Sequence, residues 1–464
     1  MKFFPIVCLC SMLWLTGCAS TGVITGADSS SRASGTAAPA SSTTSEVIGN
    51  KQAAISVSGE LLPITATLAA SSAVAQLAPP ADLWERIRRG YAMPDLESPL
   101  VHDRELWYSS RNDYILRMTE RSRKYLFHIV EELERRNMPT ELALLPFVES
   151  AFNPQAVSSA KAAGMWQFMP ATGKNFELKQ NAFRDDRRDV LASTRAALDY
   201  LQKLYGMFGD WQLALAAYNW GEGSVGRAIS KNQRAGLGTS YSELNMPMET
   251  RFYVPKLQAV KNIVRNPAAF NSSLPQIENH PYFQTVDIKR DIDVALAAKL
   301  AEVPLEDFKA LNPSASRPVI LAAGTPQILL PWDNAAIFQR NLEAYSGGRL
   351  ASWTVWLAPT TMRPADAAKR VGMTEQALRI VNNIPSRGVV IKAGSSLLVA
   401  RSSHLETDVA VHLADNGQLS LAALAAPKRP AAKGRKPAAR GKTKARAPVA
   451  RGKAVAKPAS PVKR

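Results

Sequence analysis

The stretch ALLPFVESAFNPQAVSSAKAAGMWQFMPA, residues 143–171, carries a single carboxylate, Glu149, directly after an apolar run. Moving a charged carboxylate into apolar surroundings is costly, so burial at this point would raise the pKa of Glu149. If the run is helical, Glu149 lies near the C-terminal end of the helix, where the helix dipole also disfavours a negative charge. Both effects favour a protonated group near neutral pH, which suits a general acid. The alternative is a half-exposed Glu that closes a core helix.

Four short motifs follow one another in this part of the chain. They read ES, GMWQ, AYN and ETRFYV and begin at Glu149, Gly164, Ala217 and Glu249. In this order and spacing, over roughly 105 residues, they resemble the motifs of the family 1 lytic transglycosylases, which share the goose-type lysozyme fold. Four motifs in order are far more specific than any one of them alone.

Glycoside cleavage commonly uses two carboxylates, and four nearby acidic residues are candidates for the second one. Asp185 and Asp186 belong to the charged run RDDRRD and are expected to form a solvated or salt-bridged turn. Asp189 is expected to cap a helix, and Glu222 lies in a Gly-flanked turn where it could contact substrate. The residues alone leave the second carboxylate open.

The resemblance implies that one Glu does both jobs. Glu149 would protonate the oxygen of the β-1,4 bond between N-acetylmuramic acid and N-acetylglucosamine, and the substrate's N-acetyl group would stabilise the developing cation as an oxazolinium. Glu149 would then accept a proton from the muramoyl 6-hydroxyl, which closes onto the anomeric carbon and leaves a 1,6-anhydro end. Neither water nor a protein nucleophile is needed.

The resemblance also implies which side chains bind the glycan. Amide groups would hydrogen-bond the N-acetyl groups, and the two tyrosines would line the sugar site or support the oxazolinium. Ser150 would orient Glu149 or anchor a backbone turn. The expected substrate-binding residues are Ser150, Met165, Gln167, Tyr218, Asn219 and Tyr253.

Three tryptophans lie in or near these motifs, and their expected roles differ. In this family a Met often precedes the Gln of the GMWQ-type motif, whereas this chain has Trp166, which is expected to keep a stacking role there. Trp211 and Trp220 are expected to be core residues and receive no role in the site.

Apolar periodicity predicts a mainly α catalytic domain. Residues 121–136 give the clearest helix, with one apolar stripe and with Glu131–Arg135 and Glu132–Arg136 pairs four residues apart. Asp189 and Asp210 are expected to cap two further helices, the second of them spanning residues 211–220.

After Pro275 the sequence repeats itself at an interval of about 72 residues. Each copy reads as a strand, two short helices and a strand, a βααβ unit that resembles LysM, a module that binds N-acetylglucosamine-containing glycans. The copies occupy residues 284–345 and 351–402, and the second fits the LysM pattern better. Both lack the Gly-Asp-Thr-Leu that usually follows the first strand, so a purely structural role remains an alternative to glycan binding.

The N-terminus predicts a lipid anchor. A short positive start, an apolar run too short to span a membrane, and Leu15-Thr16-Gly17-Cys18 resemble a bacterial lipoprotein signal. Cleavage before Cys18 would make it the lipidated residue, and Ala19 after it points to the outer membrane, facing the periplasm. The alternative is a chance Cys in an ordinary signal peptide.

The net charge of +18 comes mainly from the C-terminus. Residues 428–464 hold 14 Lys or Arg and no acid, so this tail is expected to be disordered and to bind anionic surfaces. Nucleic acid is not expected as a partner, because a lipoprotein signal places the tail outside the cytoplasm. Five His and three Cys show no metal-ligand spacing, so neither a metal nor another cofactor is expected.

These observations predict a goose-lysozyme-like (SLT) catalytic domain followed by two LysM-like modules. The predicted function is that of a peptidoglycan lytic transglycosylase. A hydrolytic muramidase of the same fold and a non-catalytic cell-wall-binding lipoprotein are the alternatives. The predicted segments are a signal peptide at 1–17, a flexible tether at 18–80, the catalytic domain at 81–275, the modules at 284–345 and 351–402, and a basic tail at 422–464.

Overall fold

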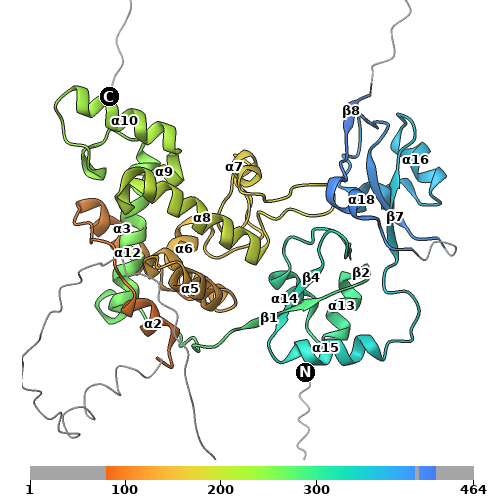
Figure 1. Ribbon diagram of the computed structural model, residues 1–464, viewed down its shortest axis with the longest axis horizontal. Coiled ribbons are helices and arrows are strands. Elements are labelled where there is room, and N and C mark those ends of the chain that lie inside the picture. The colour runs from red at the N-terminus through yellow and green to blue at the C-terminus, as the bar shows by residue number, and fades with distance from the viewer. Residues whose placement is uncertain (1–79, 403–406, 425–464) are drawn as a thin grey trace, which may run out of the picture. The chain divides into compact units, whose positions relative to one another are not determined.

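A computed structural model describes residues 80–402 and 407–424 (Figure 1). The predicted signal, Cys18, the tether and most of the basic tail lie outside these residues. The described chain forms a helical domain followed by two small modules that mix helices with two-stranded sheets, which confirms the predicted fold class. Among the described helices, none is both long and apolar enough to cross a membrane.

The helical domain has eleven α-helices and three 3-10 helices in the described residues. They are α2 (Leu83–Arg89), α3 (Pro99–Ser109), α4 (Asn112–Ser122), α5 (Leu126–Arg135), η1 (Thr140–Leu144), α6 (Leu145–Ser150), α7 (Pro170–Asn175), α8 (Val190–Phe208), α9 (Trp211–Trp220), α10 (Glu222–Arg234), η2 (Tyr241–Glu243), α11 (Met248–Arg251), α12 (Tyr253–Arg265) and η3 (Pro267–Phe270).

Side-chain caps fix the start of the two helices that were predicted from their apolar faces. The Asp189 carboxylate accepts from two backbone N–H groups at the start of α8, and Asp210 does the same for Leu213 in α9. Gly209, with a φ of 65°, ends α8 in the left-handed conformation, which glycine adopts without strain. Both predicted caps are confirmed, as are the bounds of the helix over residues 211–220.

The predicted helix over 121–136 is interrupted. α4 ends at Ser122, and α5 begins at Leu126. The Ser122 hydroxyl donates to the Thr119 carbonyl at 2.6 Å, and hydroxyls that bond back to helix carbonyls favour a bend. The apolar stripe of α5 is buried as predicted, and both predicted ion pairs form.

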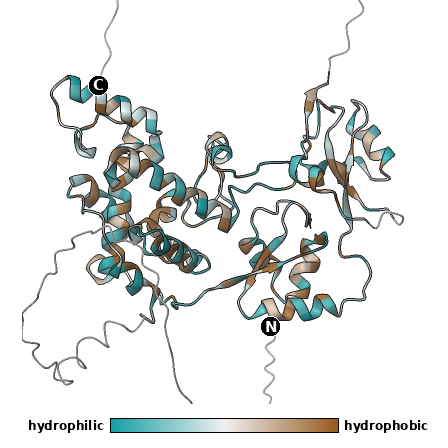
Figure 2. Cartoon of the chain, in the orientation of Figure 1, coloured by the Kyte–Doolittle hydropathy of each residue, from teal (hydrophilic) through white to brown (hydrophobic). Residues whose placement is uncertain are grey.

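A buried ion pair ties η1 and α12 together. The Lys261 ammonium lies 2.9 Å from the Glu141 carboxylate, which also accepts from the backbone N–H groups of Ala92 and Met93. Both charged groups are therefore hydrogen-bonded, as burial requires. Since α6 follows η1 directly, this pair fixes the position of α6 against α12. Figure 2 shows hydrophobic and hydrophilic residues mixed along these helices, whose buried apolar side chains form one core.

Each small module has the same plan. The first consists of β1 (Phe283–Asp287), β2 (Ile292–Asp293), α13 (Val294–Leu300), α14 (Leu305–Leu311), β3 (Val319–Ile320), β4 (Gln327–Pro331) and α15 (Asn334–Glu343). The second consists of β5 (Trp353–Leu357), α16 (Pro364–Arg370), α17 (Glu375–Asn382), β6 (Val389–Ile391) and β7 (Ser396–Ala400), followed by α18 (Val411–Asn416) and β8 (Leu421–Ala423). β1 pairs antiparallel with β4, and β5 pairs antiparallel with β7.

One buried asparagine per module repeats the same hydrogen bonds. The Asn312 amide bonds the Phe308 carbonyl and both backbone groups of Leu329. Asn382 makes the equivalent bonds to Leu378 and Leu398. The repeat that was predicted from sequence therefore extends to the contacts that hold the second helix against the last strand.

Residues 177–189 of the helical domain contact both modules. The Asn181 amide donates to the carbonyls of Ala414 and Asp415, and Arg184 pairs with the Asp415 carboxylate at 3.0 Å. Phe183 packs in a small apolar cluster with side chains of the two modules, including Leu398. This segment thus belongs to the packing of the modules as well as to the helical domain.

Candidate active site

Three helices bring the predicted site residues together. Glu149 is the penultimate residue of α6, Tyr218 and Asn219 lie in the last turn of α9, and Tyr253 is the first residue of α12. α12 packs against both α6 and α9. Residues far apart in the chain therefore meet at adjoining helix ends.

Glu149 is positioned by a sharp helix end. Ala151, with a φ of 51°, stops α6 in the left-handed conformation, so the helix ends at Ser150. The Glu149 side chain is partly exposed and accepts a hydrogen bond from the Tyr253 hydroxyl through Oε1. Within the described ranges, Oε2 has no hydrogen-bond partner. One carboxyl oxygen is thus held by the protein, while the other is left without a partner in the described residues.

The surroundings raise the pKa of Glu149 to about 7. Desolvation is the largest cause, since apolar residues surround the carboxyl group and disfavour its charged form. The Tyr253 hydrogen bond and the Lys256 ammonium act in the opposite direction, while the Glu249 carboxylate adds to the rise. Near neutral pH, Glu149 therefore exists in both the acid and the base form.

The two tyrosines of the site remain neutral. Burial and the neighbouring Glu149 raise the pKa of Tyr253 and of Tyr218 well above the ordinary value of 10. Tyr253 donates to Glu149, and Tyr218 donates to the Trp166 carbonyl at 2.9 Å. Both phenols thus act as hydrogen-bond donors, and Tyr218 connects α9 to the GMWQ segment.

Ser150 connects α6 to the same segment. Its hydroxyl donates to the Met165 carbonyl at 2.9 Å and accepts from the Asn153 N–H at 3.1 Å. The Met165 side chain is only 1% exposed, so the group of Met165 that participates in this contact is its backbone. Of the two roles considered for Ser150, anchoring a turn is the one that these bonds perform. Direct contact of Ser150 or Met165 with substrate stays a prediction.

Gln167 and Asn219 keep polar groups available at the site. Gln167 has a φ of 50°, and its amide nitrogen donates to the Gly164 carbonyl at 2.7 Å, which leaves its amide oxygen free. The Asn219 oxygen accepts from the Thr250 hydroxyl at 2.8 Å, so its amide N–H groups remain as donors. Both side chains are partly exposed. Their predicted bonds to N-acetyl groups are compatible with this geometry and stay predictions.

The expectation of a stacking face at Trp166 is wrong. Trp166 is 0% exposed, and its indole N–H donates to the Thr194 hydroxyl at 3.1 Å. The ring therefore fills the core beneath the site and presents no face to a sugar. The sequence alone does not distinguish an aromatic residue that lines a cleft from one that is buried in the core next to it.

The other acidic residues are engaged elsewhere. Asp185 pairs with Arg187 at 2.7 Å, and Asp186 lies 3.6 Å from the Arg184 guanidinium, as the salt-bridged turn predicted. Glu222 accepts from the Tyr200 hydroxyl at 2.7 Å and lies 3.1 Å from the Lys203 ammonium. The Tyr200 ring in turn contacts that of Tyr218, and a contact of Glu222 with substrate stays a prediction.

Sequence reasoning missed three residues that act on the site. Glu249 and Lys256 bias the charge of Glu149, and Thr250 holds Asn219. Glu249 and Thr250 are the first two residues of the ETRFYV motif, which was a usable signal. Lys256 is three residues beyond Tyr253, one turn further along α12. In the described ranges, no three His, Cys, Asp or Glu side chains gather as a metal site requires.

Comparisons with known proteins match both parts of the described chain. The family described as "Transglycosylase SLT domain" matches residues 128–237, and that described as "Lytic transglycosylase MltD, LysM-like domain" matches residues 282–347. The second match falls on the first module, which fitted the general LysM pattern less well than the second module did.

Two curated relatives carry the name membrane-bound lytic murein transglycosylase D. The protein of Escherichia coli (strain K12) is 35% identical over 340 residues, which cover 70% of this chain and 74% of the relative. The protein of Escherichia coli O6:H1 matches to the same extent. Glu149, Gln167 and Tyr218 lie inside the matched SLT domain. Since the 35% identity extends over more than two thirds of both proteins, the chain belongs to the family of membrane-bound lytic murein transglycosylase D.

Proposed function

We propose that Glu149 performs both proton transfers of a lytic transglycosylase reaction. The protein is a peptidoglycan lytic transglycosylase, and its substrate is the β-1,4 bond between N-acetylmuramic acid and N-acetylglucosamine. In the first step the protonated Oε2 of Glu149 gives its proton to the glycosidic oxygen as the bond to the anomeric carbon breaks. The carbonyl oxygen of the substrate's own N-acetyl group adds to that carbon and forms an oxazolinium.

In the second step the Glu149 carboxylate accepts the proton of the muramoyl 6-hydroxyl. The 6-oxygen then bonds to the anomeric carbon, and the N-acetyl oxygen leaves. The product is a 1,6-anhydro-N-acetylmuramic acid end, and Glu149 is protonated again. A group whose pKa is about 7 loses and regains a proton with little cost at neutral pH, which is what a single acid–base residue needs.

Neighbouring side chains orient the reacting groups in this proposal. The free N–H groups of Asn219 and the free oxygen of Gln167 bind the N-acetyl substituents. Tyr253 holds Oε1 of Glu149, so that Oε2 faces the glycosidic oxygen. Tyr218 stays a neutral phenol beside the developing cation. The observation that carries the proposal is the partly exposed Glu149 carboxyl, desolvated and held through one oxygen by Tyr253.

Mass spectrometry of the products from purified sacculi tests the reaction. Anhydro ends support the proposal, reducing ends would mean a hydrolytic muramidase, and no release would mean a binding protein. Glu149→Gln keeps shape and size but removes the titratable proton, so we expect turnover to fall by about two to four orders of magnitude. The variant should still bind sacculi. Glu97→Gln, which changes an exposed carboxylate, is the matched control. Activity of Glu149→Gln above about a tenth of wild type would contradict the single-acid mechanism.

We also propose that the protein is an outer-membrane lipoprotein that faces the periplasm. The relatives are named as membrane-bound, and the sequence before Cys18 resembles a lipoprotein signal. Acyl chains on Cys18 would anchor the mature N-terminus. The basic tail, residues 428–464, would bind anionic lipid or cell-wall groups by charge alone.

A further inference from the structure

A cavity of about 690 Å³ lies at the far ends of the segments that carry the candidate active site. Residues 136–139 line it and lead into η1 and α6, whose other end carries Glu149. Trp211, the first residue of α9, also lines it, whereas Tyr218 lies seven residues further along, about 10 Å away. Residues 213–217 of α9, which lie between them, are buried. The cavity is therefore separate from the cleavage site, and its volume is typical of a ligand pocket.

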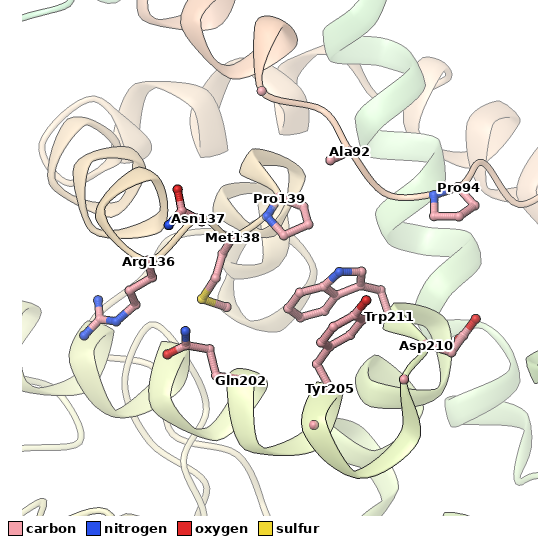
Figure 3. A pocket seen from close by; sticks show the side chains of 13 residues that line it. Ala92, Pro94, Arg136, Asn137, Met138, Pro139, Gln202, Tyr205, Asp210 and Trp211 are labelled. Carbon is pink, nitrogen blue, oxygen red and sulfur yellow. The ribbon is translucent and has the colours of Figure 1, made fainter. Parts of the chain in front are cut away.

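Stacked aromatic rings form one wall of this cavity. The Tyr205 and Trp211 rings lie 4.3 Å apart between centroids and 19° from parallel. Tyr205 is 39% exposed, so the stack is not a core contact alone. Figure 3 shows both rings, together with Met138 and Gln202, around a common space. Met138 and Pro139 are buried and supply an apolar floor. A flat aromatic wall with an apolar floor suits the C–H face of a pyranose ring.

The α8–α9 turn does not need the aromatic stack for its geometry. Gly209 closes the turn in the left-handed conformation, and its N–H bonds the Tyr205 carbonyl at 2.8 Å. Asp210 then caps α9 through the Leu213 N–H. Since backbone and cap already fix the turn, the exposed ring surface is available for another use.

Uncommitted polar groups surround the rings. The side-chain amides of Asn137 and Gln202, the Tyr205 hydroxyl and the Trp211 indole N–H all belong to lining residues. None of these four groups has a hydrogen-bond partner within residues 80–402 and 407–424. Amides, a hydroxyl and an indole N–H can together satisfy the hydroxyl and N-acetyl groups of a sugar.

The charges of the lining favour a neutral ligand. The Arg136 guanidinium already pairs with Glu132 at 2.5 Å and lies 3.5 Å from Asp199. The Asp210 carboxylate is exposed at the rim. No positive charge of the described lining is thus left for an anionic ligand, such as a stem peptide or a phosphate. N-acetylglucosamine is neutral, whereas the muramic acid residues of the same strand bear the peptides.

We propose that this cavity is a second glycan-binding site, which takes an N-acetylglucosamine unit of a peptidoglycan strand apart from the cleavage site. The proposal rests on the proposed function, because it assigns a further contact to the same substrate. The cavity holds the polymer while the active site cuts it. Binding in the cavity therefore favours the cleavage of long strands, which reach both sites, and not of short ones.

Binding is tested in the full chain with Glu149→Gln, which removes turnover. The probe is the N-acetylglucosamine tetramer, titrated by isothermal calorimetry. In the same background, Tyr205→Ala with Gln202→Ala removes the outer ring and one amide from exposed positions of α8. We expect the loss of one binding site, or about a tenfold weaker affinity at one site. Met207→Ala, an exposed residue of α8 outside the cavity, is the control and should leave the isotherm unchanged.

Two further variants separate recognition from folding. Asn137 has a φ of 51°, so Asn137→Gly keeps the backbone and removes only the amide, and it should weaken the same site. Tyr205→Phe keeps the ring and should retain most of the binding. Isotherms of the double variant that equal those of Met207→Ala would overturn the proposal, as would binding of a sugar-free stem peptide at this cavity in place of the tetramer.

Kinetics with the active enzyme give the second readout. Tyr205→Ala with Gln202→Ala should raise KM on intact sacculi several-fold and leave kcat on a short soluble glycan unchanged. An equal loss on both substrates would overturn the assignment, because it would mean damage to the active site. A failure of the proposed reaction can be told apart from a failure of this second site. In the first case the wild-type products would lack anhydro ends, while the Glu149→Gln variant would still bind the tetramer.

Discussion

Glu149→Gln should stabilise the folded protein at neutral and alkaline pH. Burial raises the pKa of Glu149 from 4.5 to about 7, so the folded state prefers the protonated acid. Below pH 4.5 the group is protonated in both states and contributes no difference. Between pH 4.5 and 7 the unfolded chain loses the proton first, so the group's contribution to folding stability falls as the pH rises. At about 1.4 kcal/mol per pKa unit, the loss at pH 8 is at most roughly 3 kcal/mol.

The amide of the Glu149→Gln variant would avoid this loss because it has no proton to release, and it can keep the hydrogen bond from Tyr253. Urea unfolding of both proteins, followed by far-ultraviolet circular dichroism at pH 4, 6 and 8, measures the difference. We expect similar midpoints at pH 4 and a gap in favour of Glu149→Gln that grows up to pH 8. Glu222→Gln is the opposite control, because the Tyr200 hydrogen bond lowers the Glu222 pKa and its stabilising contribution exists above pH 4.5. A pH-independent gap, or a destabilised Glu149→Gln at pH 8, would refute the desolvation argument.

Three other outcomes are expected. Tyr253→Phe removes a hydrogen bond that stabilises the Glu149 carboxylate, so the pKa of Glu149 should rise and the alkaline limb of kcat/KM on sacculi, expected near pH 7 in the wild type, should move upward. Tyr125→Phe should leave this limb in place, and a downward shift in Tyr253→Phe would contradict the argument. Cys18→Ser should release the protein from the membrane fraction or leave it uncleaved; sedimentation with outer membranes in high salt would assign the anchor to another element. Deletion of residues 428–464 should weaken binding to anionic vesicles and make that binding less dependent on salt, while activity on soluble strands stays unchanged. An unaltered salt dependence would mean that the tail does not bind the surface.

The sequence predicted those features that depend on local chemistry. An Asp before an apolar helix is a cap wherever the helix packs, and Asp189 and Asp210 both serve as caps. The repeat in the C-terminal half was visible because each module needs the same apolar positions for its own small core. The position of Glu149 near a helix end followed from the apolar run before it.

Features that depend on distant packing escaped prediction. Trp166 is buried because α8 covers it and supplies Thr194 as a partner, and no local pattern encodes that contact. Phe183 directly precedes a charged run, yet it packs with side chains of both modules. Trp211 and Trp220 were expected to be core residues, but both are only partly buried. The turn at Gly209 brings the Trp211 ring against that of Tyr205.

The acid–base character of Glu149 illustrates the same division. The apolar run before it supplies the desolvation, which alone would hold the group protonated and make it a poor base. The opposing Tyr253 hydrogen bond and Lys256 charge come from α12, about a hundred residues later in the chain. In the proposed mechanism Glu149 must first donate and then accept a proton, which needs both influences, and the two meet where α6 packs against α12. The buried Glu141–Lys261 pair, which links η1 to α12, holds these two segments against each other and so keeps the apolar run and the α12 groups together around Glu149.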